Sequence, residues 1–191
     1  MEATIRSRSA QFAVVLAMLL GAEAVPMEGA DSAMALTLTS SAFEPGTEIP
    51  SRYTCEGENI SPPLLWDDVP AGAKSLVLII EDPDAPDPKA PKRVWVHWIL
   101  YNLPPGTRGL AENADKTGIP EGASPGLTDA KKTSYGGPCP PIGRHRYFHK
   151  LYALDTALDL AQPTRAELEA AMQGHVLAQA ELIGTYQKGD R

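Results

Sequence analysis

The stretch GGPCPPIGRHRY, which ends at Tyr147, places a stiff backbone beside side chains that donate hydrogen bonds. Prolines fix φ, and glycines allow positive φ and let a ligand approach the main chain closely. Side chains alternate along the strand that we expect to follow, so His145 and Tyr147 share one face. We expect backbone N–H groups around Gly136 and Gly137 to face an anion, with imidazole and phenol donors beside them.

Two further segments supply polar side chains for such a pocket. In DPDAPDPKAP, four prolines fix φ directly after an apolar run, so Asp82 leaves the end of a strand in a nearly constant direction. In VWVHWIL, the spacing of Trp95 and His97 puts them on one face of a strand. An indole, imidazoles, a phenol and a carboxylate together make a small polar pocket with apolar walls.

Each of these residues also fits a simpler structural role. Trp95 suits a core, His97 suits a satisfied buried histidine, and Asp82 can cap a turn through its own side chain, as is common next to proline. Arg146 and Lys150 point to the strand face opposite His145 and His149, where we expect solvated charges or ion-pair partners. Taken one by one, these residues leave both interpretations open.

Composition limits the classes of function. With 191 residues and 43% hydrophobic content, the chain is long enough for one domain with a sizeable core, and it has no disordered or collagen-like bias. Its formal net charge of −7 gives it no electrostatic reason to seek nucleic acid or anionic lipid surfaces. Basic residues that matter must therefore act locally, in a pocket.

Residues 1–24 have the order of regions of a secretory signal peptide. Two arginines precede an apolar run, and a small-x-small cleavage site ends at Ala24. The apolar run is shorter than the ~20 residues that a membrane span requires. A second small-x-small site ends at Ala35, so the alternative is cleavage of the signal peptide as late as residue 35. We expect a periplasmic or secreted protein whose domain spans residues 36–188.

Two cysteines, Cys55 and Cys139, remain in the expected mature chain. An even number in an oxidising compartment permits one disulfide. The loop that it would close is long, which is worth roughly 4 kcal/mol in the chain-entropy model. The alternative is two unpaired thiols, and the sequence does not decide between them.

Short apolar runs rich in β-branched and aromatic residues predict a mainly β domain. These runs lie at 36–43, 75–82, 94–103 and 146–155. The segment SLVLII is apolar at every position, which is typical of a strand covered on both faces. The connections are unusually long, and their prolines favour ordered functional loops over disorder. They span residues 53–72, 82–93 and 105–146.

One helix is predicted in the C-terminal part. It starts at Thr164, where Glu167 completes the spacing of a capping box, and Gly174 ends it. Residues 175–187 alternate well enough for a closing strand, with a helix as the alternative.

Four motifs occur in a fixed order: YTCEGENISPPLLW, DPDAP, VWVHWILYNLP and YGGPCPPIGRHRYFHKLYALD. Together they resemble the phosphatidylethanolamine-binding protein family, also called Raf kinase inhibitor proteins, in its bacterial branch. The resemblance runs from about Leu36 to Tyr186. It implies a single-domain Greek-key-type β-sandwich with one or two short helices, one of them near the C-terminus. It also implies a pocket for the phosphate of a phospholipid head group or of a phosphorylated ligand.

Matched motif by motif, the resemblance implies a ligand-binding pocket without a metal or a cofactor. Its residues are Asp82, Trp95, His97, Tyr135, Gly136, Pro140, Pro141, His145 and Tyr147. A cis peptide bond at Ala85–Pro86 is implied as well. We expect Asp82 to orient a histidine and favour its charged form, because a carboxylate that faced a phosphate would repel it. A disulfide between the two cysteines would stiffen this pocket, since both lie in segments that resemble pocket-forming ones.

The expected function is binding of a small anionic or phosphorylated ligand without catalysis, by a monomer or homodimer with no nucleic-acid partner and no stable membrane span. The Raf label is not carried over, because an exported bacterial protein would not meet that kinase. One alternative is a periplasmic inhibitor or interaction protein acting on an enzyme or a host signalling partner through loops such as 105–134. Another is a metal-assisted hydrolase using Asp82, His97 and His145, although the chain has no metal-binding spacing such as HExxH.

Overall fold

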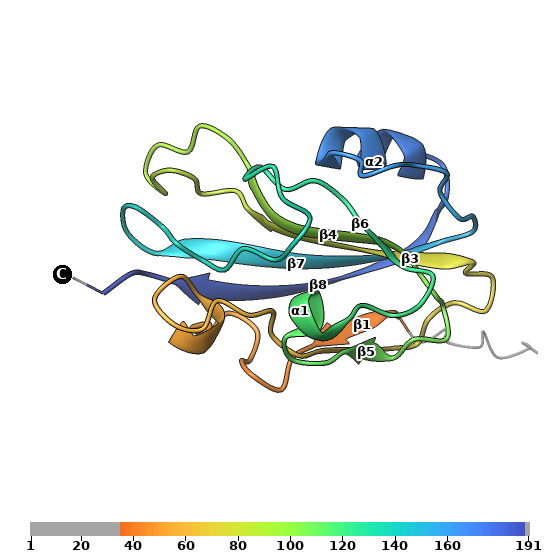
Figure 1. Ribbon diagram of the computed structural model, residues 1–191, viewed down its shortest axis with the longest axis horizontal. Coiled ribbons are helices and arrows are strands. Elements are labelled where there is room, and N and C mark those ends of the chain that lie inside the picture. The colour runs from red at the N-terminus through yellow and green to blue at the C-terminus, as the bar shows by residue number, and fades with distance from the viewer. Residues whose placement is uncertain (1–34, 190–191) are drawn as a thin grey trace, which may run out of the picture. The chain divides into compact units, whose positions relative to one another are not determined.

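The computed structural model describes residues 35–189, and the predicted signal peptide at 1–24 lies outside this range. Within it, two antiparallel β-sheets pack together, and a helix lies on the far side of the larger sheet (Figure 1). The larger sheet has the strand order β6-β4-β3-β7-β8, and the smaller one has the order β1-β2-β5. The prediction of a single mainly β domain is confirmed. In the described range, no helix has the length and apolar character needed to cross a bilayer.

The strands are β1 Thr37–Thr39, β2 Leu64–Asp67, β3 Ser75–Asp82, β4 Trp95–Leu103, β5 Gly109–Leu110, β6 Ser124–Pro125, β7 His145–Leu154 and β8 Val176–Tyr186. The helices are α1 Ala114–Thr117 and α2 Arg165–Met172, with a 3-10 turn at Ser51–Tyr53. The four predicted strands correspond to β1, β3, β4 and β7, and the closing segment is strand β8. The sequence did not predict β2, β5, β6 and α1, which have two to four residues and lie in the segments interpreted as loops, whereas the equally short β1 lies in an apolar run.

Strand β3 lies at the centre of the larger sheet, between β4 and β7, and all of its residues are buried. Leu78 and Ile80 belong to the main core between the two sheets. Val77 and Ile79 belong to a second core, which they share with residues of α2. The expectation of a strand covered on both faces is therefore confirmed.

Strand β4 changes register beside β3 at the point where the site begins. Trp98 pairs with Ile80, whereas Val96 pairs with the next residue of β3, so His97 has no partner on that strand. This two-against-one arrangement is that of a β-bulge, which bends a strand and redirects its side chains. Trp95 and His97 consequently line the same cavity, in agreement with their predicted common face.

Helix α2 has the predicted capping box. The Thr164 side chain accepts a hydrogen bond from the Glu167 N–H, and the Glu167 carboxylate accepts one from the Thr164 N–H. Leu168 and Met172 are the buried residues of the helix, and they join the second core. The helix ends two residues before Gly174, which has φ +82°. This local sequence places α2 on the outer face of the larger sheet.

Candidate functional site

A cavity of about 680 Å³ lies at the end of β3 and the first residues of β4 and β7. Residues of two loop segments, 55–59 and 128–141, complete much of its wall. This size is typical of a site for a small organic molecule. Nine residues predicted from the sequence line it: Asp82, Trp95, His97, Tyr135, Gly136, Pro140, Pro141, His145 and Tyr147. The structure thus brings all of the predicted ligand-binding residues to one place.

Asp82 and His145 form a buried pair in the cavity wall. The Asp82 Oδ2 atom lies 2.7 Å from His145 Nδ1, while Asp82 Oδ1 accepts a hydrogen bond from the Asp84 N–H at 2.7 Å. On the other side of the ring, His145 Nε2 lies 3.0 Å from the carbonyl oxygen of Ile142. Both ring nitrogens therefore lie beside acceptor oxygens. Asp82 orients a histidine, as expected.

The expected direct contact between His145 and an anion is absent from this geometry. The side chain is fully buried, and its two ring nitrogens are already engaged by Asp82 and Ile142. The physical reason is the proline-rich turn, which returns the Ile142 carbonyl onto the ring. Strand alternation gave the correct face for His145 but could not reveal this competing acceptor.

His97 and Gly136 hold each other by two hydrogen bonds. The Gly136 N–H donates to the His97 carbonyl at 3.0 Å, and His97 Nδ1 lies 2.5 Å from the Gly136 carbonyl oxygen. The other ring nitrogen, Nε2, has no hydrogen-bond partner among residues 35–189. Burial lowers the pKa of His97, and the hydrogen bond to the Gly136 carbonyl and the nearby Asp82 and Asp129 oppose this effect only in part. The neutral ring thus presents Nε2 to the cavity that it lines.

Tyr147 lies between two histidine rings and is fully buried. Its ring meets the edge of His97 at a centroid distance of 5.3 Å and stacks near His145 at 6.5 Å. Burial raises the pKa of the phenol, so the hydroxyl keeps its proton at neutral pH. In the described part of the chain, this hydroxyl has no hydrogen-bond partner. A buried, unpaired donor in a cavity wall is a candidate ligand contact.

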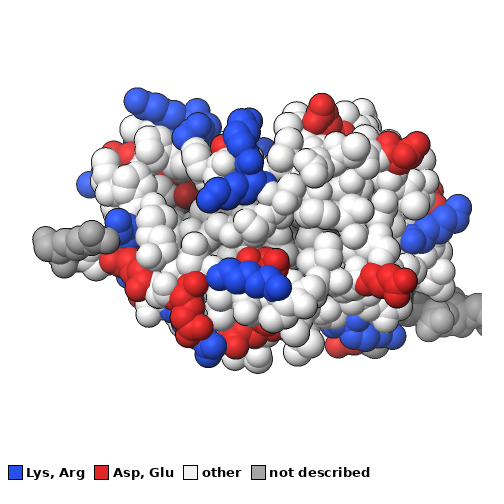
Figure 2. Space-filling model, viewed as in Figure 1, with Lys and Arg blue, Asp and Glu red and all other residues white. Residues whose placement is uncertain are grey.

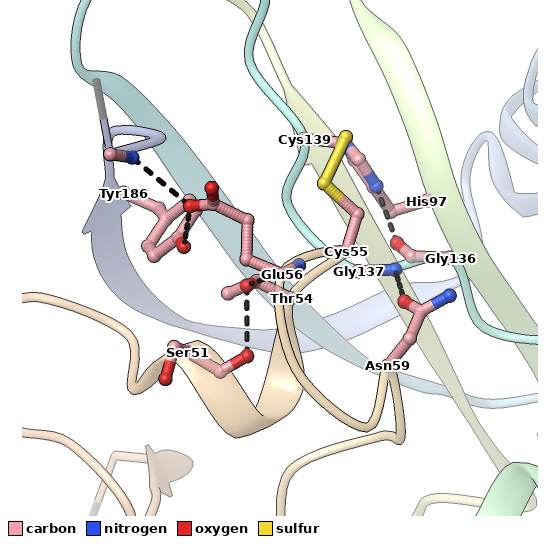
Figure 3. The surroundings of a disulfide bond; sticks show 11 residues. Ser51, Thr54, Cys55, Glu56, Asn59, His97, Gly136, Gly137, Cys139 and Tyr186 are labelled. Atoms are coloured by element: carbon pink, nitrogen blue, oxygen red, sulfur yellow. Dashed lines mark hydrogen bonds between the residues drawn. A yellow bond between two sulfur atoms is a disulfide. The ribbon is translucent and has the colours of Figure 1, made fainter. Parts of the chain in front are cut away.

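The glycine turn does not offer its N–H groups to a ligand, and this expectation is wrong. The Gly136 N–H is taken by His97, and the Gly137 N–H donates to Asn59 Oδ1 at 2.7 Å (Figure 3). A Cβ atom on Gly137 would lie 2.4 Å from the Tyr53 carbonyl oxygen and 2.6 Å from Asn59 Oδ1. Neither glycine has a positive φ, so Gly137 is required for close packing of two loops.

A disulfide joins Cys55 to Cys139, with a Cα–Cα distance of 5.4 Å (Figure 3). Both cysteines line the cavity, and the Cys55 N–H also donates to the Pro138 carbonyl at 3.1 Å. Of the two alternatives that the sequence left open, the structure has the bridged one. The bond ties the 53–59 loop to the glycine-proline turn at the rim of the cavity.

Three cations, Arg93, Lys116 and Lys132, also line the cavity. None of them forms an ion pair with a carboxylate of residues 35–189; Arg93 instead lies over the Trp95 ring, 4.3 Å from its centroid. Figure 2 shows Lys and Arg side chains over the loop that joins β3 to β4. These cations were not predicted from the sequence, because they come from two loops and helix α1 and form no local cluster.

The acidic residues of the lining are engaged to different degrees. Glu58 pairs with Arg52 at 3.0 Å, and Asp82 is bonded to His145. Asp115 Oδ1 accepts from the Ser61 N–H at 3.2 Å, and its charge is not balanced by an ion pair. Within the described range, three cations without an ion pair thus outnumber the two lining carboxylates, Asp82 and Asp115, that have no Lys or Arg partner, which favours an anionic ligand.

Other sequence expectations can be placed around the cavity. Arg146 pairs with Asp84 at 2.7 Å, and Lys150 pairs with Glu81 at 2.7 Å, so both are ion-pair partners. The Arg146 hydrogen bond lowers the pKa of Asp84. The Ala85–Pro86 peptide bond is cis. No group of three or more His, Cys, Asp or Glu side chains within residues 35–189 is placed to hold a metal ion.

The family model described as "Phosphatidylethanolamine-binding protein" matches residues 39–187. The chain belongs to the phosphatidylethanolamine-binding protein family. A UPF0098 protein of Methanothermobacter thermautotrophicus is 52% identical over 156 residues, which are 81% of this chain and 100% of that relative. The solved structure of a phosphatidylethanolamine-binding protein homologue from Chlamydia trachomatis is 48% identical, with a TM-score of 0.73 over 81% of this chain and 99% of its own.

A second solved family member is YbcL from E. coli. It is 30% identical, with a TM-score of 0.74, and the match covers 82% of this chain and 100% of that one. The described domain therefore corresponds to a complete family domain, and the fold that the four motifs implied is confirmed.

Proposed function

We propose that this phosphatidylethanolamine-binding family member binds small phosphorylated or other anionic ligands in the cavity, without catalysis. The observation that carries the proposal is the charge balance of the cavity. Arg93, Lys116 and Lys132 have no carboxylate partner in the described range, and beside them lie His97 Nε2 and the Tyr147 hydroxyl, which also lack partners. The cations are exposed and attract an anion by charge, while the buried His97 Nε2 and Tyr147 hydroxyl gain from a polar ligand that a neutral apolar one would not supply.

The shape of the cavity adds a second requirement to the ligand. Its volume of about 680 Å³ is large for an isolated anion, and apolar side chains form much of its wall. These include Ala85, Pro86, Trp95 and Pro140. The Trp95 ring is partly exposed and is covered on one side by Arg93. A ligand with an anionic group and a compact organic part fits this combination better than inorganic phosphate alone.

Isothermal calorimetry with phenyl phosphate tests this function. We expect binding to wild-type protein, and we expect Lys132→Ala to weaken it about fivefold to tenfold, the scale of one charge-assisted contact. Lys74→Ala is the matched control, because Lys74 lies directly before the opposite end of β3 and does not line the cavity. Failure of wild-type protein to bind, or an equal loss with Lys74→Ala, would show that the cavity is not the anion site.

Export is the second part of the proposal. The order of regions in residues 1–24 supports it, and so does the Cys55–Cys139 disulfide, since such bonds persist mainly in oxidising compartments. Fractionation of producing cells should recover the protein outside the cytoplasm, with an N-terminus near Val25 or Leu36. A chain that kept Met1 in the cytoplasmic fraction would contradict export but not ligand binding.

A further inference from the structure

We propose that His97 makes the cavity selective for phosphate monoesters that carry a proton, and against phosphodiesters and sulfate monoesters of the same charge. This inference rests on the proposed anion-binding function and narrows its ligand class. It concerns the hydrogen-bonding character of one nitrogen atom, His97 Nε2, and of the hydroxyl group of Tyr147, whose ring packs against that of His97 and which lines the same cavity.

The tautomer of His97 follows from its partner. A backbone carbonyl can only accept a hydrogen bond, so the 2.5 Å contact with the Gly136 oxygen requires a proton on Nδ1. A neutral imidazole has only one such proton. Nε2 of neutral His97 is therefore a hydrogen-bond acceptor. The bulge in β4 fixes the ring in this position, and the second hydrogen bond, from the Gly136 N–H, holds the turn against it.

The surroundings of His97 favour the neutral ring. The residue is 7% exposed, and burial is the largest influence on its pKa, which it lowers. Asp82 and Asp129 raise the pKa of His97, and His145 lowers it. Asp82 is also hydrogen-bonded to His145, and Asp129 accepts from the Val96 N–H at 2.7 Å. These carboxylates have other donors, and neither is bonded to the His97 ring.

Tyr147 complements this acceptor with a donor. Its hydroxyl lacks a partner among the described residues, and its ring lies 5.3 Å from that of His97. The acceptor at Nε2 matches a singly protonated phosphate monoester, whose P–OH group donates while its other oxygens accept. A phosphodiester or sulfate ester anion has acceptor oxygens only. Against Nε2 it would meet a lone pair, or it would require protonation of a ring whose neutral form is favoured by burial.

The selectivity separates two sources of phosphate. Phospholipid head groups in a bilayer are phosphodiesters, with no proton to give at ordinary pH. Many phosphorylated metabolites and phosphorylated side chains are monoesters with a second pKa near 6, so about half of them carry a proton at pH 6 and roughly a tenth at pH 7. The cavity is thus suited to a free monoester rather than to a lipid head group.

The test compares three ligands of equal charge at pH 5: ethyl phosphate, dimethyl phosphate and ethyl sulfate. Each is close to a monoanion there, but only ethyl phosphate carries a P–OH group. By calorimetry, we expect wild-type protein to bind ethyl phosphate at least tenfold tighter than the other two. His97→Asn removes Nε2 while its amide can still donate to the Gly136 carbonyl, and we expect the preference to fall to about twofold.

His175→Asn is the control for the substitution itself. His175 is about half exposed, pairs with Asp155 at 2.8 Å and lies away from the cavity lining, so the tenfold preference should persist in this variant. Equal binding of all three ligands by wild-type protein would overturn the selectivity and leave anion binding intact. A tenfold preference that survived His97→Asn would overturn the role of His97. Binding of none of the three would refute the proposed function itself.

Discussion

Glu81 and Asp82 are neighbours on β3 and are almost equally buried, at 3% and 4% exposure, but they serve opposite faces of the sheet. On the α2 face, Glu81 pairs with Lys150 at 2.7 Å and with Arg165 at 2.8 Å. On the cavity face, Asp82 is bonded to His145 at 2.7 Å. The same chemical group, one residue apart, connects a helix to the sheet in one case and orients a site histidine in the other.

The difference lies in what surrounds each carboxylate. On the α2 face, two cations meet Glu81, and Arg165 also pairs with Glu169, so the charges balance locally. On the cavity face, His97 Nε2 and the Tyr147 hydroxyl have no partner in the described range, and both residues line an open volume. A buried carboxylate alone does not mark a binding site; unpaired polar groups beside a cavity do.

The largest effect is expected from the disulfide, a covalent link on the cavity side. Replacing both Cys55 and Cys139 with serine should lower the free energy of unfolding by about 4 kcal/mol, because the bond joins residues 84 positions apart. Binding of phenyl phosphate should also weaken, since the rim loops are no longer tied. Urea denaturation and calorimetry measure the two effects. Wild-type protein treated with a reductant should behave like the double variant; unchanged stability after complete reduction would contradict the prediction.

The neighbouring carboxylates provide the direct comparison. Asp82→Asn should cost about 3 kcal/mol of stability, because it leaves a buried histidine without its charged partner. It should also weaken phenyl phosphate binding, since His145 and Tyr147 pack together in the wall. Glu81→Gln should cost less, about 2 kcal/mol, because the Lys150 and Arg165 side chains are 25% and 29% exposed and can reach water.

Binding separates these two variants more sharply than stability does. Glu81→Gln should leave the affinity for phenyl phosphate unchanged within about twofold, whereas Asp82→Asn should not. If both variants lost affinity equally, the two faces of β3 would be coupled, and the contrast between them would be false.

A third test uses pH and two histidines on the same face of β7. His145 has an acceptor oxygen beside each ring nitrogen, whereas the ring of His149 is buried without such partners among residues 35–189. Burial lowers the pKa of His149 from 6.5 to about 4. The unfolded chain takes up the His149 proton below about pH 6.5, and the folded chain only near pH 4. Stability attributable to His149 should therefore be complete above pH 6.5 and fall by about 3 kcal/mol as the pH drops to 4.

The variant that isolates this effect is His149→Leu, which fills the space beside Phe43 without a titratable group. Urea denaturation between pH 7 and pH 4 should show a shallower loss of stability than for wild-type protein. The residual slope belongs to groups such as His97, whose pKa burial also lowers. An identical slope in the variant and in wild-type protein would show that His149 does not titrate in this window.

The sequence predicted the positions of the site residues better than their roles. Long apolar runs predicted β3, β4 and β7, and local alternation placed Asp82, Trp95 and His97 where the cavity forms. These signals are local, so they survive without knowledge of the fold. The short elements β2, β5, β6 and α1 lie outside these runs and were not predicted.

The roles depend on partners that are distant in the chain. The Gly137 N–H is used by Asn59, 78 residues away, and the cations of the lining come from two loops and helix α1. The Ile142 carbonyl, only three residues from His145, occupies a ring nitrogen because of the geometry of the turn. No spacing rule reveals which donors are already satisfied, so the sequence assigned the anion to groups that the fold has used.

The smallest expected effect tests the corrected role of the glycine turn, through two adjacent glycines of the cavity rim. On Gly137, an added Cβ would lie 2.4 Å from the Tyr53 carbonyl oxygen and 2.9 Å from Thr54 Cα, both backbone atoms that cannot move aside alone. On Gly136, the nearest atom would be the His97 carbonyl oxygen at 3.9 Å, an ordinary contact. Gly137→Ala should therefore cost about 2 kcal/mol of stability through overpacking, and Gly136→Ala should cost less than about 0.5 kcal/mol.

Urea denaturation compares the stabilities of the two variants, and calorimetry with phenyl phosphate compares their affinities. Gly137→Ala should weaken binding, because it pushes apart the loops that the disulfide and Asn59 hold together, while Gly136→Ala should bind like wild-type protein. If the turn offered its own N–H groups to the anion, both alanine variants would keep those groups, and folded Gly137→Ala protein would bind phenyl phosphate normally. Normal binding would therefore support the anion-binding turn. The hydrogen bonds of the turn to His97 and Asn59 argue against it.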